Sequence, residues 1–310
     1  MYTVKANQYS KDILSENNFL KNGEFHKEYG KIHSIFKKSL NIKISSKLIN
    51  IIGNVNMKLP FSIEVNDSII EYLTYNLSVG DNVSINYKNK KVIFNNIGLE
   101  LSILDGEYEY TIKNKNFNIN TVKTNLKIIG DFIKDSNIQN GFSKSNKEFL
   151  ERLSYNENTQ IDEFYNNIIR LKNVVVFNRE KEDLFSYFIG RGKGLTPSGD
   201  DLILGLISFL KISGEDNMSK ELYKYLQNKG RKRTTDISLE YLMYGCKGKV
   251  GHMINDLCEA MLDDDLDIIE EKLINVSKKG HTSGIDTILG IFLGMVAIIE
   301  KNKLNKIGVN

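Results

Sequence analysis

Short apolar runs separated by turn-forming residues fill the first half of the chain, and this pattern predicts a sheet. The runs are rich in Ile, Val and Tyr, and pairs such as Gly53-Asn54 and Asp105-Gly106 separate them. The stretch from Ser78 to Phe94 is typical of a hairpin, with polar Asn89 at its turn. The predicted strands are Leu48–Val55, Phe61–Val65, Asn82–Tyr87, Lys91–Phe94, Gly98–Leu104 and Tyr108–Ile112.

From about Asn118 onward the apolar residues recur at helical intervals instead. The predicted helices are Val122–Lys134, Lys147–Leu153, Ile161–Asn173, Glu182–Phe188, Asp200–Lys211, Ser219–Gln227, Asp236–Tyr244, Ile254–Met261, Leu266–Val276 and Asp286–Glu300. We therefore expect an α+β protein with a β-rich barrel or sandwich-like domain over residues 1–117 and a mostly α-helical domain over residues 118–310. The first domain has no reactive groups at a meaningful spacing, so we interpret it as a scaffold or interaction surface.

Composition and charge narrow the class of protein. The 310 residues are 41% hydrophobic and 26% charged, as in a soluble globular protein, and the net charge of +3 gives no reason to expect a nucleic-acid partner. Cys246 and Cys258 form no C-x-x-C pair, which fits a reducing compartment. Met1–Leu14 has no apolar region typical of a signal peptide, and the apolar stretch Ile288–Ile299 is shorter than the roughly 20 residues of a membrane span. We expect a cytoplasmic protein without a membrane partner.

A glycine-rich loop precedes one helix start, in the sequence GRGKGLTPSGDD from Gly190 to Asp201. Glycines allow positive φ and bring backbone N–H groups close to a ligand, and a helix N-terminus attracts anions. Either Thr196 or Ser198 could cap the helix, and Pro197 suits its start. The spacing matches neither the P-loop nor the dinucleotide fingerprint. A capped turn without a ligand stays the alternative; otherwise, the substrate-binding candidates here are Arg191, Gly192, Lys193, Gly194, Thr196, Ser198, Gly199 and Asp200.

A second helix start repeats the first. Aligned on serine, SGDDLILGL from Ser198 matches SGIDTILGI from Ser283, including the later glycines Gly205 and Gly290. A glycine inside a helix costs up to about 1 kcal/mol relative to alanine, and close approach of two helices would offset that cost. We infer two equivalent helices that cross near these glycines and direct their N-termini at a common cavity. The substrate-binding candidates of this segment are Thr282, Ser283 and Gly284.

Acids and a histidine at these helix starts are the catalytic candidates. Asp201 and Asp286 would repel an anion unless a cation intervenes, but they could accept N–H bonds from an amide or carbamoyl group. Histidine exchanges protons near neutral pH, so His281 is the preferred general base or carbonyl polariser, with a capping or packing role as the alternative. Ser283 is a weak candidate for a nucleophile, because helix capping explains it better.

Another basic segment, Arg231–Ser238, precedes a further helix start. It is either a solvated turn or a wall on which Arg233, Thr234 and Thr235 close the anion side of the cavity. No metal-ligand pattern is evident among the histidines, and no cofactor is predicted. Magnesium held by Asp200, Asp201 and Asp286 remains open.

The strings GKGLTPSGDD and GHTSGID resemble the AllH-type subunit of oxamate carbamoyltransferase. IHSIF at Ile32–Phe36 and LPFSIEV at Leu59–Val65 also resemble its N-terminal part. The resemblance implies an enzyme subunit that acts with two other subunits in anaerobic allantoin breakdown, where oxalurate and phosphate interconvert with oxamate and carbamoyl phosphate. It then implies that Asp201 and Asp286 orient the amide and that His281 polarises the carbonyl.

On the same resemblance, the phosphate or carboxylate is held by Gly192, Gly194, Thr196, Ser198 and Gly199. The Ser-x-Arg-Thr motif of the aspartate and ornithine transcarbamoylases is not present, so that fold is not expected. Three other readings stay open: a regulatory or assembly subunit that binds an effector, a stand-alone magnesium-dependent enzyme acting on a small phosphorylated or carboxylate substrate, and glycines that serve helix packing alone.

Overall fold

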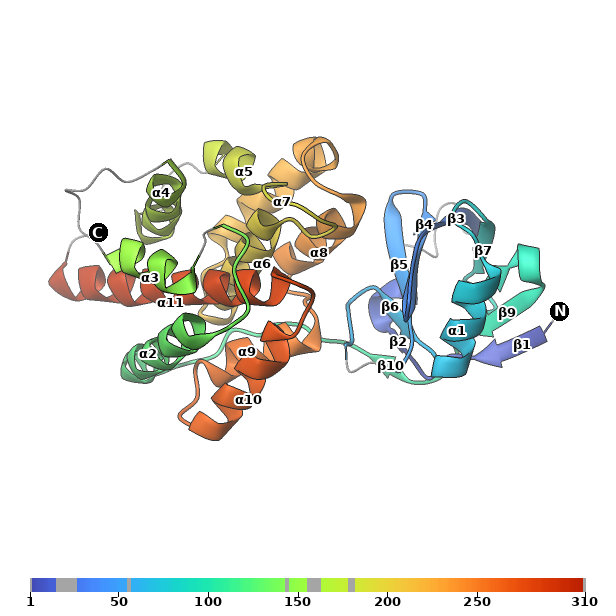
Figure 1. The fold of residues 1–310 in the computed structure, drawn as a ribbon, viewed down its shortest axis with the longest axis horizontal. Helices are drawn as coiled ribbons and strands as arrows, with labels where there is room; N and C mark the ends of the chain where they lie inside the picture. The colour runs from blue at the N-terminus through green and yellow to red at the C-terminus, as the bar shows by residue number, and fades with distance from the viewer. Residues whose placement is uncertain are drawn as a thin grey trace. The chain divides into compact units, whose positions relative to one another are not determined.

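Two compact units, Met1–Tyr110 and Thr111–Asn310, make up the chain, and each has its own hydrophobic core. The computed structural model describes residues 2–14, 27–54, 57–142, 145–154, 163–177 and 182–308. The first unit is built on a sheet and the second is helical (Figure 1). The predicted α+β class with segregated halves is confirmed.

The first unit is a single ten-stranded sheet that curls into a half-barrel (Figure 1), so of the two predicted forms it is barrel-like. Its strand order is β1-β9-β8-β7-β3-β4-β5-β6-β2-β10. Most neighbours are antiparallel, and the parallel pairs are β1 with β9, β5 with β6 and β2 with β10. The strands are β1 (Tyr2–Lys5), β2 (Gln8–Ser10), β3 (Lys27–Phe36), β4 (Ser39–Ile44), β5 (Lys47–Ile52), β6 (Ser62–Glu64), β7 (Asn82–Asn86), β8 (Lys91–Phe94), β9 (Leu99–Ser102) and β10 (Glu107–Tyr108).

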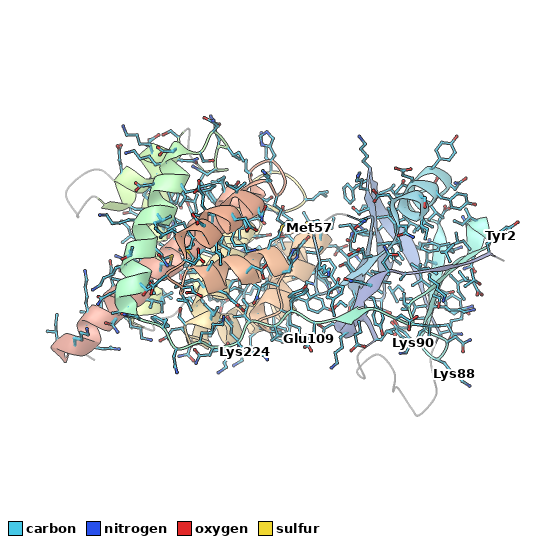
Figure 2. The ribbon with its side chains drawn as sticks, turned by 90° about the horizontal axis from the view of Figure 1, so that it is seen from below. Tyr2, Met57, Lys88, Lys90, Glu109 and Lys224 are labelled. Atoms are coloured by element: carbon cyan, nitrogen blue, oxygen red, sulfur yellow. The ribbon has the colours of Figure 1, made fainter. Side chains whose placement is uncertain are left out.

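The predicted hairpin is present as β7 and β8, which pair antiparallel from Val83–Phe94 to Asn86–Lys91. Lys88 and Lys90 lie at its turn (Figure 2), and Lys90 has a positive φ of 49°. A register shift between Ile32 and Ser34 of β3 interrupts the pairing with β4, and such bulges bend a sheet.

Several elements of this unit were not predicted. The polar content of β3, whose sequence is KEYGKIHSIF, leaves only a partial alternation of buried and exposed residues. Helix α1 (Asp67–Asn76) buries Ile70 and Leu73 in the core of the sheet unit. The predicted strand Tyr108–Ile112 is wrong beyond Tyr108, because Thr111 already belongs to the helical unit and pairs there with Lys249. Short 3-10 helices of this unit are η1 (Lys11–Leu14) and η3 (Asn95–Ile97), and the helical unit contains a further one, η4 (Gly230–Lys232).

Each predicted helix of the second unit overlaps an observed one. These are α2 (Ile119–Asp135), α3 (Asn146–Ser154), α4 (Glu163–Phe177), α5 (Glu182–Phe188), α6 (Ser198–Ile212), α7 (Asn217–Lys229), α8 (Asp236–Cys246), α9 (His252–Ala260), α10 (Leu266–Ser277) and α11 (Ser283–Ile307). The predicted strand end at Val55 and the first two residues of the predicted helix Ile161–Asn173 lie outside the described residues.

Helices α6 and α11 form the centre of this unit, and almost every residue of α6 is buried. Helix α11 has 25 residues, which is longer than the predicted Asp286–Glu300, and it is long and apolar enough to cross a membrane by length and composition alone. However, 78% of its apolar window is buried inside the unit, so it is a core helix here.

Candidate functional site

Helices α6 and α11 cross backbone to backbone at two glycines. A Cβ atom at Gly205 would lie 2.0 Å from the carbonyl oxygen of Thr287, and a Cβ atom at Gly290 would lie 2.0 Å from that of Leu202. Gly205 and Gly290 occupy equivalent positions in α6 and α11, and so do the two contacted residues, Leu202 and Thr287. The crossing is therefore reciprocal. The predicted crossing near the glycines is confirmed.

The same reciprocity extends to the first turns. A Cβ atom at Gly199 would lie 2.1 Å from the carbonyl oxygen of Phe188, at the end of α5. A Cβ atom at Gly284 would lie 2.2 Å from the carbonyl oxygen of Val276, in the last turn of α10. Each long helix therefore starts against the end of the preceding helix, and α5–α6 and α10–α11 are equivalent helix–loop–helix pairs.

The serine of each helix start faces the opposite helix rather than capping its own. The N-cap residues are Pro197 and Thr282, and neither forms a side-chain cap hydrogen bond. The hydroxyl groups of Thr196 and Ser283 instead lie 2.7 Å apart. Capping by Thr196, Ser198 or Ser283 was therefore a wrong expectation, because both serines are the first helical residues and not the caps. The two helix starts nevertheless converge.

Ser198, Asp201, Ser283 and Asp286 form what we call the serine–aspartate cluster. The side chain of Asp201 is 3% exposed and that of Asp286 is 0% exposed. Burial raises the pKa of Asp201 to about 7, while Lys279 and the Ser283 hydroxyl oppose the rise and Asp286 adds to it. Burial also raises the pKa of Asp286 to about 6, against the opposing effects of the Gly141 N–H and of neighbouring hydroxyls, that of Ser198 among them.

The carboxyl oxygens of these two acids are only partly hydrogen-bonded. The Oδ1 atom of Asp286 accepts the backbone N–H of Gly141 at 2.9 Å. The Oδ2 atoms of Asp201 and Asp286 are buried and have no partner in hydrogen-bond geometry among the described residues. Buried polar atoms are normally paired, so these two oxygens distinguish the cluster from the rest of the helical core.

Asp200 has a structural role that distinguishes it from Asp201. Its carboxylate accepts the N–H of Gly190 at 2.7 Å, the hydroxyl of Ser238 at 2.6 Å and the hydroxyl of Thr234. Burial raises its pKa and these donors lower it. Asp200 thus ties the glycine loop to the basic segment, and its committed oxygens make it a poor magnesium ligand. The described residues contain no group of three or more His, Cys, Asp or Glu that could hold a metal ion.

The glycine loop requires glycine at specific positions. Gly190, Gly192 and Gly194 have φ values of 80°, 120° and 93°. A Cβ atom would lie 1.8 Å from the Arg233 carbonyl oxygen at Gly190 and 2.7 Å from the Ser198 nitrogen at Gly192. The loop therefore packs closely on the start of α6 and on the basic segment, and glycine is needed at Gly190 and Gly192 for this packing.

The predicted cations lie around this loop at the surface. The guanidinium group of Arg191 lies over the Tyr187 ring, 4.3 Å from its centroid, and its side chain is exposed, as is that of Lys193. Arg233 is exposed and donates to the carbonyl oxygen of Ser186 at 3.4 Å. His281 is exposed on the loop between α10 and α11. Their roles toward a substrate stay predictions.

The threonines of the basic segment hold local structure. Thr234 donates to Asp200, and Thr235 accepts the backbone N–H of Ser238 at 3.0 Å as the N-cap of α8. Thr235 also donates to the carbonyl oxygen of Leu195 in the glycine loop. The structure therefore brings this segment to the glycine loop, while its role as a wall on the anion side of a cavity stays a prediction.

Two residues of the site were missed by the sequence analysis. A Cβ atom at Gly141 would overlap the Ser198 hydroxyl at 1.8 Å, so the chain between α2 and α3 lies directly on the cluster. The Nζ atom of Lys279 lies 4.6 Å from the centroid of the Tyr241 ring, close enough to Asp201 to affect its pKa. The available signals were the turn-forming pair Asn140-Gly141 and the position of Lys279 directly before the second motif.

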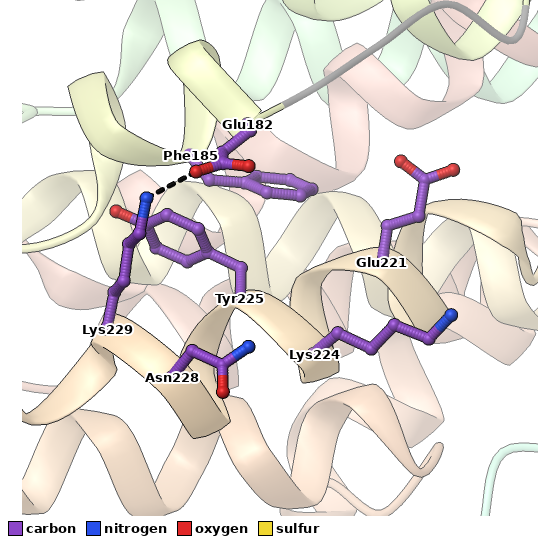
Figure 3. Close-up of a pocket in the computed structure, with 7 residues that line it drawn as sticks. All are labelled: Glu182, Phe185, Glu221, Lys224, Tyr225, Asn228 and Lys229. Atoms are coloured by element: carbon purple, nitrogen blue, oxygen red, sulfur yellow. Dashed lines mark hydrogen bonds and ion pairs between the residues drawn. The ribbon is translucent and has the colours of Figure 1, made fainter.

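A hollow of about 410 Å³ lies elsewhere on the helical unit, between α5 and α7 (Figure 3). An ion pair between Glu182 and Lys229 joins α5 and α7 at one end of it (Figure 3). Its lining is Glu182, Phe185, Glu221, Lys224, Tyr225, Asn228 and Lys229. None of these is a predicted site residue, so the hollow is separate from the serine–aspartate cluster.

Family models match residues in both units. The family model described as oxamate carbamoyltransferase subunit AllH matches residues 188–295, a range that contains the glycine loop and both helix starts. The AllH family N-terminal domain matches residues 5–105, which lie in the sheet unit. No solved structure matches the chain. The chain therefore belongs to the AllH family of oxamate carbamoyltransferase subunits.

Proposed function

We propose that this chain, as one subunit of a multi-subunit carbamoyltransferase, helps to interconvert oxalurate plus phosphate with oxamate plus carbamoyl phosphate. Membership of the AllH family supports a role in an oxamate carbamoyltransferase complex. The proposal adds the reaction, two other subunits as partners, a place in anaerobic allantoin breakdown in the cytoplasm, and a site at the serine–aspartate cluster.

The observation that carries the site is the reciprocal meeting of two Ser-Gly-x-Asp helix starts. It brings two buried carboxyl groups together and leaves one oxygen of each without a partner among the described residues. Helix packing by the glycines explains the crossing of α6 and α11, but it does not require buried acids at their first turns. Burial of unpaired carboxyl oxygens is costly, which supports a binding role.

The reaction asks for an anion site and an amide site side by side. A phosphate oxygen attacks the terminal carbonyl carbon of oxalurate, the bond from that carbon to the oxamate nitrogen breaks, and the phosphate proton passes to that nitrogen. Backbone N–H groups of the glycine loop suit the anionic oxygens, whereas those of Gly199 and Gly284 at the helix starts already donate to carbonyl oxygens of Arg191 and Lys279. The Oδ2 atoms of Asp201 and Asp286 suit the amide N–H groups, and His281 is proposed to polarise the carbonyl group.

The test is phosphorolysis of oxalurate by the complex reconstituted with its partner subunits. We expect Asp201→Asn and Asp286→Asn each to lower kcat at least 100-fold while gel filtration shows an intact complex. His281→Ala should lower kcat about 10- to 100-fold, within the range of general acid–base contributions. Asp264→Asn, at an exposed acid of the same unit, is the matched control and should leave kcat unchanged.

Unchanged turnover in both aspartate variants, with assembly intact, would assign the cluster to effector binding or assembly instead. The proposal assigns no step to a metal ion, so loss of turnover with a chelator and its recovery with added magnesium would contradict it.

A further inference from the structure

Lys279 occupies a fixed position beside the serine–aspartate cluster. Its backbone N–H donates to the carbonyl oxygen of Val276 at 3.0 Å, and its carbonyl oxygen accepts the N–H of Gly284 at 2.9 Å. The residue is therefore held to the end of α10 on one side and to the first turn of α11 on the other. Its neighbour Lys278 is exposed.

The side chain of Lys279 contacts Tyr241 and lies close enough to Asp201 for their charges to interact. Its Nζ atom lies over the Tyr241 ring of α8, at a distance typical of a cation–π contact. Desolvation lowers the pKa of Lys279, and the charge of Asp201 on α6 opposes that change. The α10–α11 loop, α8 and α6 thus place the amine of Lys279 near the carboxyl group of Asp201. Within the described ranges Lys279 forms no ion pair.

An amine and an unpartnered carboxyl oxygen that are close but not paired suit a small ligand with two unlike ends. An anionic oxygen binds an ammonium group, and an amide N–H donates to a carboxylate. We propose that Lys279 and Asp201 together bind such a ligand, with its anionic oxygen on Lys279 and its NH₂ group on Oδ2 of Asp201. This rests on the proposed function for the identity of the ligand, and it names Lys279 as the anion-binding side chain of that site.

The geometry distinguishes Lys279 from the exposed cations that the sequence favoured. Arg191, Lys193 and Arg233 are all exposed, whereas Lys279 is partly buried against an aromatic ring and next to a helix N-terminus. A desolvated ammonium group interacts more strongly with an anion than an exposed one does. The three exposed cations can then attract anions toward the loop, while Lys279 determines how a bound anion is oriented.

The experiment compares Lys279→Met with the matched control Lys278→Met in the reconstituted complex. We expect Lys279→Met to raise KM for oxalurate or phosphate at least 10-fold with a smaller change in kcat, and Lys278→Met to change neither. The substrate whose KM rises identifies whether the bound anion is a carboxylate or a phosphate. Equal KM values in Lys279→Met and wild type would overturn the inference while leaving the proposed function in place.

A binding measurement tests the inference if the complex shows no turnover, which is the result that would refute the proposed function. Thermal shifts of the full chain are then measured with oxamate and with inorganic phosphate. A shift in wild type and Lys278→Met that is lost in Lys279→Met supports the inference. The same shift in all proteins, or no shift in any of them, overturns it.

Discussion

Replacing Gly205 by alanine tests the backbone contact on which the site depends. The added Cβ atom would lie 2.0 Å from the carbonyl oxygen of Thr287, whereas ordinary C···O contacts are about 3.3 Å or longer. The two helices must therefore separate locally by about 1 Å. Overpacking of this kind costs about 1–3 kcal/mol, and the obstacle is backbone that cannot rotate away, so we take the upper end. Alanine returns up to about 1 kcal/mol of helix propensity.

The expected net loss is about 2 kcal/mol in the free energy of unfolding. For a unit of this size that corresponds to a fall in Tm of roughly 4–8 °C, measured by circular dichroism of the full chain. Gly290→Ala should behave in the same way, since a Cβ atom there would lie 2.0 Å from the carbonyl oxygen of Leu202. The double variant should cost less than the sum of the two, because one separation of the helices relieves both clashes.

Gly130→Ala on α2 is the control, because its Cβ atom would meet only a Phe292 ring carbon at 3.6 Å. It should leave Tm unchanged or raise it slightly. A Tm of Gly205→Ala within 1 °C of wild type would refute the reciprocal crossing of α6 and α11. So would full additivity in the double variant with Gly290→Ala.

Three further outcomes follow from the same contacts. Asp200→Asn should lower the free energy of unfolding by at least about 2 kcal/mol in urea titrations, because an amide nitrogen cannot accept from donors that the carboxylate now satisfies. The folded state raises the pKa of Asp201 from 3.8 to about 7, so between these pH values the folded chain binds a proton that the unfolded chain releases. The resulting contribution to stability is lost as pH rises from about 4 to 7. Asp201→Asn should flatten that decline and be the more stable protein at pH 8, and a decline as steep as in wild type would contradict the assignment. Gly192→Ala, at a φ of 120° and with a Cβ atom 2.7 Å from the Ser198 nitrogen, should weaken phosphate binding in calorimetry at least 10-fold, whereas Gly194→Ala, where a Cβ atom meets nothing within 4 Å, should weaken it less.

The fold class and most helices could be predicted from the sequence, because they depend on local hydrophobic period and on breakers. The helix containing Leu202–Leu210 and the hairpin at Asn89 are examples, since each pattern repeats over a whole element. The strands β1 to β4 could not be found in this way. A strand such as Lys27–Phe36 takes its conformation from pairing with its neighbours, and its own polar residues hide the alternation.

For the site, the sequence by itself determined the residue types and the internal match between the two helix starts. The match predicted the crossing because mid-helix glycine at equivalent positions has few other physical explanations. It could not show that Ser198 and Ser283 reach across to the opposite helix. That depends on which residue is the N-cap, a matter of a single position in the chain.

Only the tertiary structure separated Asp200 from Asp201. The two acids are adjacent in sequence and equally suited to a helix start, but they project in different directions from α6. One faces Gly190, Thr234 and Ser238 and is fully hydrogen-bonded. The other lies close to Asp286 of α11 and to Lys279, and one of its oxygens has no hydrogen-bond partner among the described residues. Neighbouring residues on a helix point about 100° apart, so their surroundings are decided by what packs on each side, which local sequence does not encode.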